Sequence, residues 1–445
     1  MSSPKTTPNP SKATSPSSGL GRTGVVLLGN RATFGLVNLA AAAVAVRALG
    51  FEAFGVVVLC HAVARLVGDT LRFQSWQAIL SFGTPLLDRS EGRGLRRLVG
   101  VTLALDVAAL TVALGLLMIL APWLGAVLGW SQDVQDWVRF YALAAVFMTS
   151  ATPTGVLRLA ERFDVLNWQH ATNATIRLAG ALLVFWLGLG LDALIIVWFG
   201  AAAVAGGWMM WRAVVIYRAM QGRLPEVGGA KMPSGFWRFV LSTNLASSVS
   251  SAMLHGSTLA VGAVLGPSAA GLYAIVRQVS EALAKPAKLL GPVMLPAFSE
   301  TRLGSADASN ALMARALGVG LLAMAAIVTV MVLAGDVLLA TVFGPEALAA
   351  DDLLLLASTA AAVMLWGFAL EPALLAARRA DVALILCLSA ALVYALLLAW
   401  LLPTQGLVGA GIALLAHATL LFLGRLLVVG FVVRGRCSVD QPETV

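Results

Sequence analysis

Charge is scarce in this chain of 445 residues. Asp, Glu, Lys and Arg make up 12% of it and hydrophobic residues 59%, whereas an average soluble protein carries roughly 25% charged residues. Cysteine and histidine are also scarce: the three cysteines and four histidines are spread along the chain. Their spacing excludes a disulfide framework and leaves no readable metal or haem site. No cofactor is therefore expected.

Residues 1–23 are rich in Ser, Pro and Thr and lack the apolar stretch of a signal peptide. We expect a disordered cytoplasmic tail there. A second short cytoplasmic tail is expected at residues 434–445.

Long apolar windows, by contrast, are abundant. Many exceed the ~20 residues that cross a bilayer, and a helix satisfies its own backbone hydrogen bonds in lipid. We therefore predict an all-α polytopic membrane protein. Charged residues and turn signals divide the apolar windows into twelve predicted transmembrane helices: 24–48, 54–82, 98–121, 136–157, 165–188, 192–217, 236–263, 269–298, 310–334, 352–376, 382–402 and 406–430.

The loops between these helices differ in charge. Every second loop is basic, and the remaining loops are mainly acidic. The basic loops hold Arg89, Arg93, Arg96, Arg97, Arg158, Arg162, Arg218, Arg223, Lys231, Arg302, Arg378 and Arg379. The positive-inside rule places these loops and both termini in the cytoplasm, so the net charge of +8 indicates membrane orientation rather than a nucleic-acid partner. No predicted outer loop is long enough for a catalytic domain, so we expect a transport protein and not an enzyme.

The chain also repeats itself. "LGFEAFGVVVL" (49–59) matches "LGPSAAGLYAI" (265–275) at a shift of 216 residues, and "AERFDV" (160–165) matches "ARRADV" (377–382) at a shift of 217. Six predicted helices fall in each half, so the halves have the same orientation, an arrangement found in transporters. We predict an N-terminal six-helix lobe at 24–219, a cytoplasmic linker at 220–235 and a C-terminal six-helix lobe at 236–433.

The second predicted helix is unusually polar. At about 100° per residue, its polar side chains fall in one stripe about 80° wide: His61, Arg65, Asp69, Arg72 and Trp76. Asp69 is spaced to pair with Arg65 or Arg72. A shift of 216 residues takes the first four stripe positions to four charged residues of the eighth helix, namely Arg277, Glu281, Lys285 and Lys288.

We expect both stripes to face a water-filled cleft, because a charge at the bilayer centre costs roughly 2.5–3.5 kcal/mol. The charge balance of the cleft is positive, and guanidinium groups bind phosphate oxygens through paired hydrogen bonds. An anionic cargo is therefore predicted. The proposed binding residues are Arg31, His61, Arg65, Arg72, Arg177, Asn244, Arg277 and Lys285, and the proposed charge partners or coupling groups are Asp69, Glu281 and His255.

A plainer interpretation stays open. The charges can be structural ion pairs between packed helices, above all at Arg72, Lys285 and Lys288 near the cytoplasmic side. The small and hydroxyl residues at 242–257 can serve only close helix packing, while His61 and His255 are conceivable proton sites. Three prolines in the eighth helix remove backbone hydrogen bonds and predict a kink or break: Pro286, Pro292 and Pro296.

The stretches "LGFEAFGVVVL" (49–59), "RFQSWQAILSFG" (72–83) and "LGPSAAGLYAIVRQVSEALAKPAKLLGPVMLP" (265–296) resemble the polysaccharide-transporter branch of the MOP flippase superfamily, the Wzx-type oligosaccharide flippases. The likeness covers about residues 20–430. It implies a bacterial inner-membrane protein with two six-helix lobes that form a V around a central cleft.

The resemblance also implies a function. Such proteins move undecaprenyl-diphosphate-linked oligosaccharide repeat units to the periplasmic leaflet by alternating access, for lipopolysaccharide or exopolysaccharide biosynthesis. Their partners are membrane lipids and the polysaccharide polymerase machinery. Cavity arginines in the family lie on helices 1, 2, 7 or 8, and Arg31, Arg65 and Arg277 match these places. The seventh helix departs from the pattern and offers only Asn244 and His255.

Two other functions remain as alternatives. A drug or small-solute exporter of the MATE branch or the major facilitator superfamily is disfavoured, because such exporters favour acidic cavities for cationic drugs. A membrane polymerase or ligase for the same glycan is disfavoured by the short outer loops.

Overall fold

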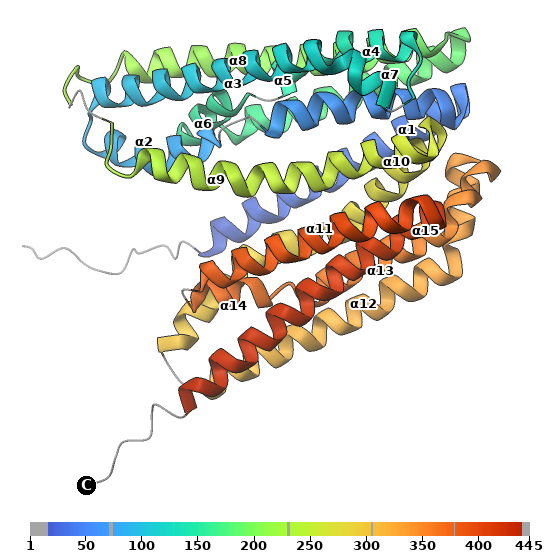
Figure 1. Cartoon of the computed structure of the whole chain (residues 1–445). Helices are drawn as coiled ribbons and strands as arrows, with labels where there is room; N and C mark the ends of the chain where they lie inside the picture. Colours follow the sequence, from blue (N-terminus) through green and yellow to red (C-terminus); the bar gives the residue numbers. More distant parts are fainter. Residues whose placement is uncertain are drawn as a thin grey trace, which may run out of the picture.

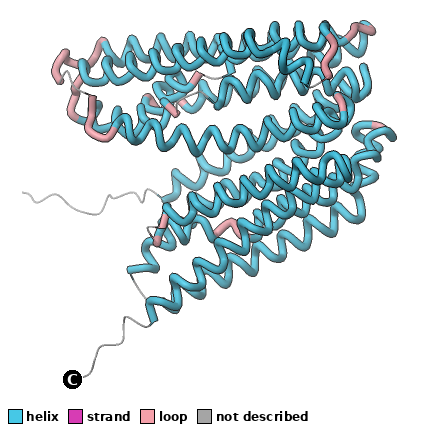
Figure 2. The backbone as a smooth tube through the Cα atoms, viewed as in Figure 1, coloured by secondary structure: helices cyan, strands magenta, loops and turns pink. Residues whose placement is uncertain are grey.

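The computed structural model describes residues 17–70, 74–127, 129–148, 150–228, 232–303, 306–377 and 379–437. Within these ranges every regular element is helical and no strand occurs (Figure 2). The fold class predicted from composition is therefore confirmed. The first and last helices extend a few residues into the predicted tails, because α1 begins at Ser17 and α15 ends at Cys437.

Helix α1 (Ser17–Thr70) holds two arms. Gly50 interrupts it with φ 79° and ψ 172°, and the chain turns back there (Figure 1). This break agrees with the predicted end of the first span. The second predicted span, however, is not one helix: α1 ends at Thr70, Gln74 has the non-helical ψ of 52°, and α2 (Ser75–Asp88) begins after it.

The first half continues with α3 (Gly92–Val127), α4 (Gln132–Ala142), α5 (Ala145–Met148), α6 (Ala151–Leu159), α7 (Phe163–Leu187) and α8 (Leu191–Gln221). The predicted span 136–157 is thus divided among three short helices. Pro153 lies in the first turn of α6, where a missing N–H is tolerated, whereas a helix continued through residue 149 would clash with the proline ring. The proline therefore favours a new helix start at α6, which the apolar pattern did not show.

The second half consists of α9 (Phe236–Ser251), the π-helical turn η1 (Ala252–Gly256), α10 (Ser257–Leu265), α11 (Pro267–Leu303), α12 (Ala306–Phe343), the 3₁₀ segment η2 (Pro345–Ala350), α13 (Asp351–Trp366), α14 (Leu370–Ala376) and α15 (Ala380–Cys437). α15 turns back at Gly406, with φ 60° and ψ −137°. α11 is helical through Pro286, Pro292 and Pro296, so of the predicted kink or break, the break does not occur.

Six of the described helices are each long and apolar enough to cross a membrane, or seven if the bent pair Gln132–Ala142 and Ala145–Leu159 is one span. Two of the six, Thr33–Asp69 with 37 residues and Asp381–Gly430 with 50, contain the turning glycines and are about twice the ~20 residues of one crossing. Helices α7, α9–α10 and α11 complete the twelve spans. The apolar sequence of α7 and α11 is interrupted by the polar residues of the candidate site.

The two halves contact each other through glycines at equivalent positions of the repeat. Gly50 and Gly266 share one backbone conformation, with φ of 79° and 87° and ψ of 172° and 173°, which residues other than glycine rarely adopt. Five residues beyond each, Gly55 and Gly271 meet: a Cβ on Gly55 would lie 1.8 Å from the carbonyl oxygen of Pro267. The repeat read from the sequence therefore exists in the backbone.

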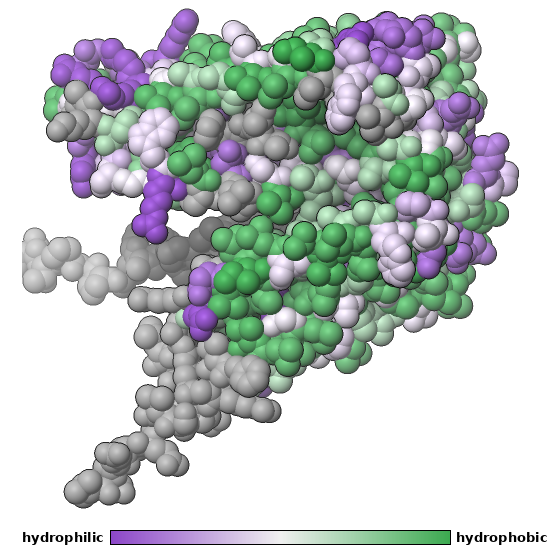
Figure 3. Space-filling model, viewed as in Figure 1, coloured by the Kyte–Doolittle hydropathy of each residue, from purple (hydrophilic) through white to green (hydrophobic). Residues whose placement is uncertain are grey.

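The helices form two bodies that meet near α10 and the start of α11 and separate toward the termini (Figure 1). In the space-filling view the molecule is hollowed on the side where the C-terminus lies (Figure 3). The opposite end carries a contact between the halves, because exposed Arg47 donates to the backbone oxygens of Thr341 and, at 3.1 Å, Val342. The V shape implied by the resemblance is confirmed, with its opening on the side of the termini.

One helix of the second half begins against the first. Buried Phe236 and Val240 of α9 pack with Ala78 of α2 and Leu98 of α3. Residues 229–231 of the predicted linker lie outside the described ranges. The lobe boundaries at 24–219 and 236–433 remain a prediction.

Candidate functional site

The second arm of α1 brings an ion pair into the middle of the fold. Arg65 Nη2 lies 3.0 Å from Asp69 Oδ2, and the Asp69 side chain is only 8% exposed. Arg65 Nη1 also donates to the backbone oxygen of Met148 at 3.4 Å. The spacing of four residues on one helix face therefore produces the pair that the stripe predicted.

His255 connects this pair to the second half. Its Nε2 lies 3.9 Å from Asp69 Oδ2, and it also lies within electrostatic range of Arg65 and Arg277. It occupies η1, where a π-helical turn changes which side chains face inward, and such turns are frequent at functional sites. Asp69 thus stands between a cation of its own helix and an imidazole of the other half.

Aromatic residues surround the first-half cations. His61 Nδ1 lies 3.2 Å from the Tyr141 hydroxyl, and its ring meets Trp198 edge-on with centroids 5.7 Å apart. The guanidinium of Arg177 stacks over the same indole, 4.2 Å from its centroid. A cation over an aromatic face is stabilised by the ring quadrupole, so Trp198 holds Arg177 without neutralising it.

The second half builds its own cluster on α11. Arg277 Nη2 donates to Glu281 Oε1 at 3.2 Å. One turn earlier the Tyr273 hydroxyl donates to Ser257 Oγ at 3.0 Å and lies 3.1 Å from the Tyr394 hydroxyl. Arg277 is within electrostatic range of both tyrosines. Both halves thus combine an arginine with phenolic hydroxyls.

A cavity of about 280 Å³ lies between these clusters, and residues from both halves line it. Arg177 and Lys285 contribute positive charge and Glu281 negative charge. The complete lining is Gly35, Asn38, Ala41, Ala42, Asn173, Arg177, Trp198, Gln278, Glu281 and Lys285. The cavity is therefore polar, cationic in balance, and shared by the two repeats.

Two arginines at this site have a buried Nε without an acceptor in the described part of the chain, a feature that they share with Arg212 and Arg425. Among the described residues, the buried Nε of Arg177 and that of Arg277 have no hydrogen-bond acceptor. A buried unsatisfied donor costs roughly 1–3 kcal/mol, and an anion with several oxygens would remove that cost by charge-assisted hydrogen bonds. The arrangement can thus hold a phosphate-like group.

The structure does not describe every predicted residue. Arg72 lies outside the described residues, and Arg31 lies on α1 but its side chain is not described. Asn244 is half-buried on α9, and its Oδ1 has no hydrogen-bond partner among the described atoms. The structure brings together the other predicted residues, namely His61, Arg65, Asp69, Arg177, His255, Arg277, Glu281 and Lys285.

The sequence reasoning missed Tyr141, Trp198 and Tyr394. The signal for Tyr394 was available, because a shift of 217 residues takes Arg177 to Tyr394, just as 216 takes His61 to Arg277. Each arginine thus corresponds to a different polar residue in the other half: Arg177 to Tyr394, and Arg277 to His61. Tyr141 and Trp198 carry no such signal, since apolar runs of membrane helices commonly contain aromatic residues.

Comparison with known proteins places this site in context. The model of a family described as polysaccharide biosynthesis protein matches residues 102–352. The inner membrane protein YghQ of Escherichia coli (strain K12) is 33% identical over 332 residues, which are 72% of this chain and 91% of that protein.

Two solved structures share the fold at 12% identity. An inward-facing multidrug resistance MATE family transporter of the MOP superfamily superposes with a TM-score of 0.69 over 92% of this chain and 96% of that one. The lipid II flippase MurJ, in an inward closed conformation, superposes with a TM-score of 0.68 over 91% of this chain and 87% of that one.

Proposed function

Because the chain belongs to the polysaccharide biosynthesis protein family, within the MOP superfamily, we propose that it is a flippase for undecaprenyl-diphosphate-linked oligosaccharide repeat units. It moves them from the cytoplasmic to the periplasmic leaflet of the bacterial inner membrane, for lipopolysaccharide or exopolysaccharide biosynthesis. It acts as a transporter without a catalytic step, and the polysaccharide polymerase machinery receives its cargo.

The observation that carries this proposal is the pair of arginines with unused donors beside a cavity shared by both halves. Arg177 and Arg277 each retain a buried Nε without an acceptor among the described residues. A diphosphate offers more acceptor oxygens than any group in the cavity, and guanidinium binds it through paired hydrogen bonds. The cavity is also lined by Asn38, Asn173 and Gln278, whose amides suit sugar hydroxyls.

Transport follows from rocking of the two lobes. The basic loops assign the open side of the V to the cytoplasm, so the described conformation receives cargo from the inner leaflet. The diphosphate and sugars enter the cleft while the polyprenyl chain stays in an apolar environment. Closing the cytoplasmic side and opening the Gly55–Gly271 side then releases the cargo outside.

Asp69 and His255 are the proposed coupling groups, with Glu281 as a third. These groups lie close to Arg65 and Arg277. An anion bound to either arginine therefore changes the electrostatic interaction between that arginine and Asp69 or His255. Protons, sodium ions or the membrane potential can supply the driving force, and the potential is worth about 2.3 kcal/mol per charge per 100 mV.

Arg65→Ala and Arg277→Ala test the proposal. Each change removes charge-assisted hydrogen bonds worth roughly 1.5–3 kcal/mol, so we expect export of surface polysaccharide to fall about tenfold or more at equal protein level. Lipid-linked repeat units should accumulate on the cytoplasmic face. Arg139→Ala is the control, since Arg139 pairs with Asp136 at an exposed site away from the cavity.

Unchanged export in both arginine variants would overturn the cargo site. The likeness to a MATE transporter favours one other candidate, a drug exporter. Increased sensitivity of a deletion strain to cationic drugs, with normal surface polysaccharide, would support that candidate and reject the flippase.

A further inference from the structure

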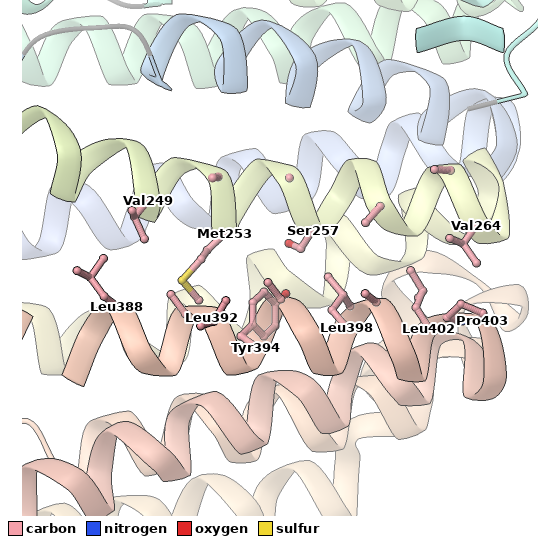
Figure 4. A pocket seen from close by; sticks show the side chains of 17 residues that line it. Val249, Met253, Ser257, Val264, Leu388, Leu392, Tyr394, Leu398, Leu402 and Pro403 are labelled. Carbon is pink, nitrogen blue, oxygen red and sulfur yellow. The ribbon is translucent and has the colours of Figure 1, made fainter. Parts of the chain in front are cut away.

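A second, apolar hollow lies beside the cationic cavity. It has a volume of about 740 Å³ and runs between α9–α10 on one wall and the first arm of α15 on the other. Figure 4 shows Val249 and Leu388 at the end toward the termini and Val264 and Pro403 at the far end. The groove is open along its rim to the surface of the molecule, because the Leu392 side chain there is 62% exposed.

Small residues face one another across this groove. One wall presents Ala252, Gly256 and Ala260, and the opposite wall presents Ala391, Ala395 and Ala399. In membranes such residues normally allow two helices to approach closely. Here the two walls enclose a space of about 740 Å³, so the small side chains leave room for a narrow apolar guest.

Among the described residues of the lining, the hydroxyls of Ser257 and Tyr394 are the only ones, and they connect the groove to the cationic site. Ser257 and Tyr394 lie opposite each other midway along it (Figure 4), and both contact the Tyr273 hydroxyl. Tyr394 and Tyr273 in turn lie within electrostatic range of Arg277. A molecule with an anionic head at Arg277 can therefore extend an apolar chain into the groove.

We infer that this groove binds the polyprenyl chain of the cargo, an inference that rests on the proposed function. From Leu388 to Pro403 the groove follows fifteen residue steps of α15, about 22 Å at 1.5 Å per residue. That exceeds half of the ~30 Å hydrocarbon core. An acyl chain confined to one leaflet cannot fill it, whereas a long polyprenyl chain can.

The groove guides the chain rather than extracting it from lipid. Lipid tails are as apolar as the lining, so transfer gains little hydrophobic free energy. The preference for the polyprenyl chain over phospholipid tails comes from its packing against the small residues and from the binding of its anionic head at Arg277.

Photocrosslinking tests this inference in the full-length protein. A benzoylphenylalanine replaces Ala395, which lines the groove, or Leu396, which is 62% exposed and lies outside the lining. The protein is placed in vesicles of phosphatidylethanolamine and phosphatidylglycerol with a trace of undecaprenyl diphosphate, irradiated, and its lipid adducts are identified by mass spectrometry.

At position 395 we expect undecaprenyl adducts in about tenfold excess over their mole fraction, equivalent to about 1.4 kcal/mol of preference. At position 396 the adducts should follow the vesicle composition, and Arg277→Ala should abolish the excess at 395. Equal composition at both positions, phospholipid adducts alone at 395, or no lipid adduct there would each overturn the inference.

Export measurements separate this inference from the proposed function. Ala395→Trp fills the groove and should slow export about tenfold, while Leu396→Trp should not. Normal export by Ala395→Trp, with export lost in Arg277→Ala, rejects the groove alone. Normal export by both Arg65→Ala and Arg277→Ala overturns the cargo site of the proposed function itself.

Discussion

In the first half of the chain the helix that carries the charged stripe is interrupted between Thr70 and Ser75, whereas its repeat partner α11 runs unbroken from Pro267 to Leu303. The prolines alone would favour the opposite outcome, because three of them lie in the interior of α11. Where a helix is interrupted inside a membrane, the backbone N–H and C=O groups that lose their helical hydrogen bonds must find other partners in the protein. The two halves differ in whether such a partner exists.

In the first half, Asp106 of α3 supplies an acceptor for the freed backbone N–H of Thr152 at the start of α6, and for the side chain, not the backbone, of Ser75 at the start of α2. Its carboxylate accepts hydrogen bonds from Ser75 Oγ at 2.6 Å, from the Thr152 backbone N–H at 2.8 Å and from Thr152 Oγ1 at 2.7 Å. It thus holds the starts of α2 and α6 together. The residue 216 positions later is Leu322, which is 73% exposed and accepts nothing. A break occurs where a third helix supplies an acceptor.

Asp106→Leu places in the first half the residue type that the second half has at the equivalent position, Leu322. Three charge-assisted hydrogen bonds would be lost, and we expect the free energy of unfolding to fall by about 4 kcal/mol. Equilibrium unfolding in mixed micelles measures this, with Asp106→Asn as the milder variant and Leu322→Ala as the control. A loss no greater than that of Leu322→Ala would show that the breaks form without this acceptor.

Gly55→Ala tests the point where the repeats meet. The new methyl group would lie 1.8 Å from the Pro267 oxygen, whereas Gly100→Ala on α3 would meet no atom within 4 Å. We expect a cost of about 3 kcal/mol from overpacking and a longer distance between spin labels on Asp133 and Glu346. Gly271→Ala should have a smaller effect, since its nearest contact is 2.9 Å. An unchanged label distance would show that this contact does not close the far side.

The ion pairs of the two stripes provide a direct comparison. Both join residues four apart, but the carboxylate of Asp69 is 8% exposed and that of Glu281 is 43% exposed. Asp69→Asn should therefore cost about 2 kcal/mol, below the 3–5 kcal/mol typical of fully buried pairs because Arg65 remains partly exposed. Glu281→Gln should cost under about 1 kcal/mol. Equilibrium unfolding in mixed micelles measures the stability loss of each variant. Equal losses would show that burial of the carboxylate does not set the strength of the ion pair.

Composition and periodicity predicted the helices, the repeat and the stripes, because each depends on local sequence. The pairing of Arg65 with Asp69 follows from their spacing on one helix. The contacts of Asp69 with His255 and of Arg177 with Trp198 join distant segments, and no local pattern specifies them.

The helix breaks show the same limit. Gly50 was predictable as a turn, since it ends an apolar window beside a charged residue. The break before Ser75 was not, because the acceptor that stabilises it is Asp106 on another helix. Equally, Pro286, Pro292 and Pro296 predicted a kink or break in α11, and the helix is not broken there.

The smallest expected effect concerns a charge pair repeated at the edge of the membrane. Arg162 binds Asp164 through two hydrogen bonds, of 2.8 and 2.7 Å, whereas the equivalent Arg379 and Asp381 make one contact of 3.4 Å. The hydrogen bonds from Arg162 hold the pKa of Asp164 below its ordinary value of 3.8. A depressed pKa stabilises the fold above the ordinary value, and the effect disappears as the pH falls through the lowered one. Asp164→Asn should therefore lower the unfolding temperature slightly at pH 7, by the equivalent of under about 1 kcal/mol, and not at all in strong acid. Asp381→Asn should have less effect at either pH, and a larger loss for Asp381→Asn would show that hydrogen-bond geometry does not set the strength of these pairs.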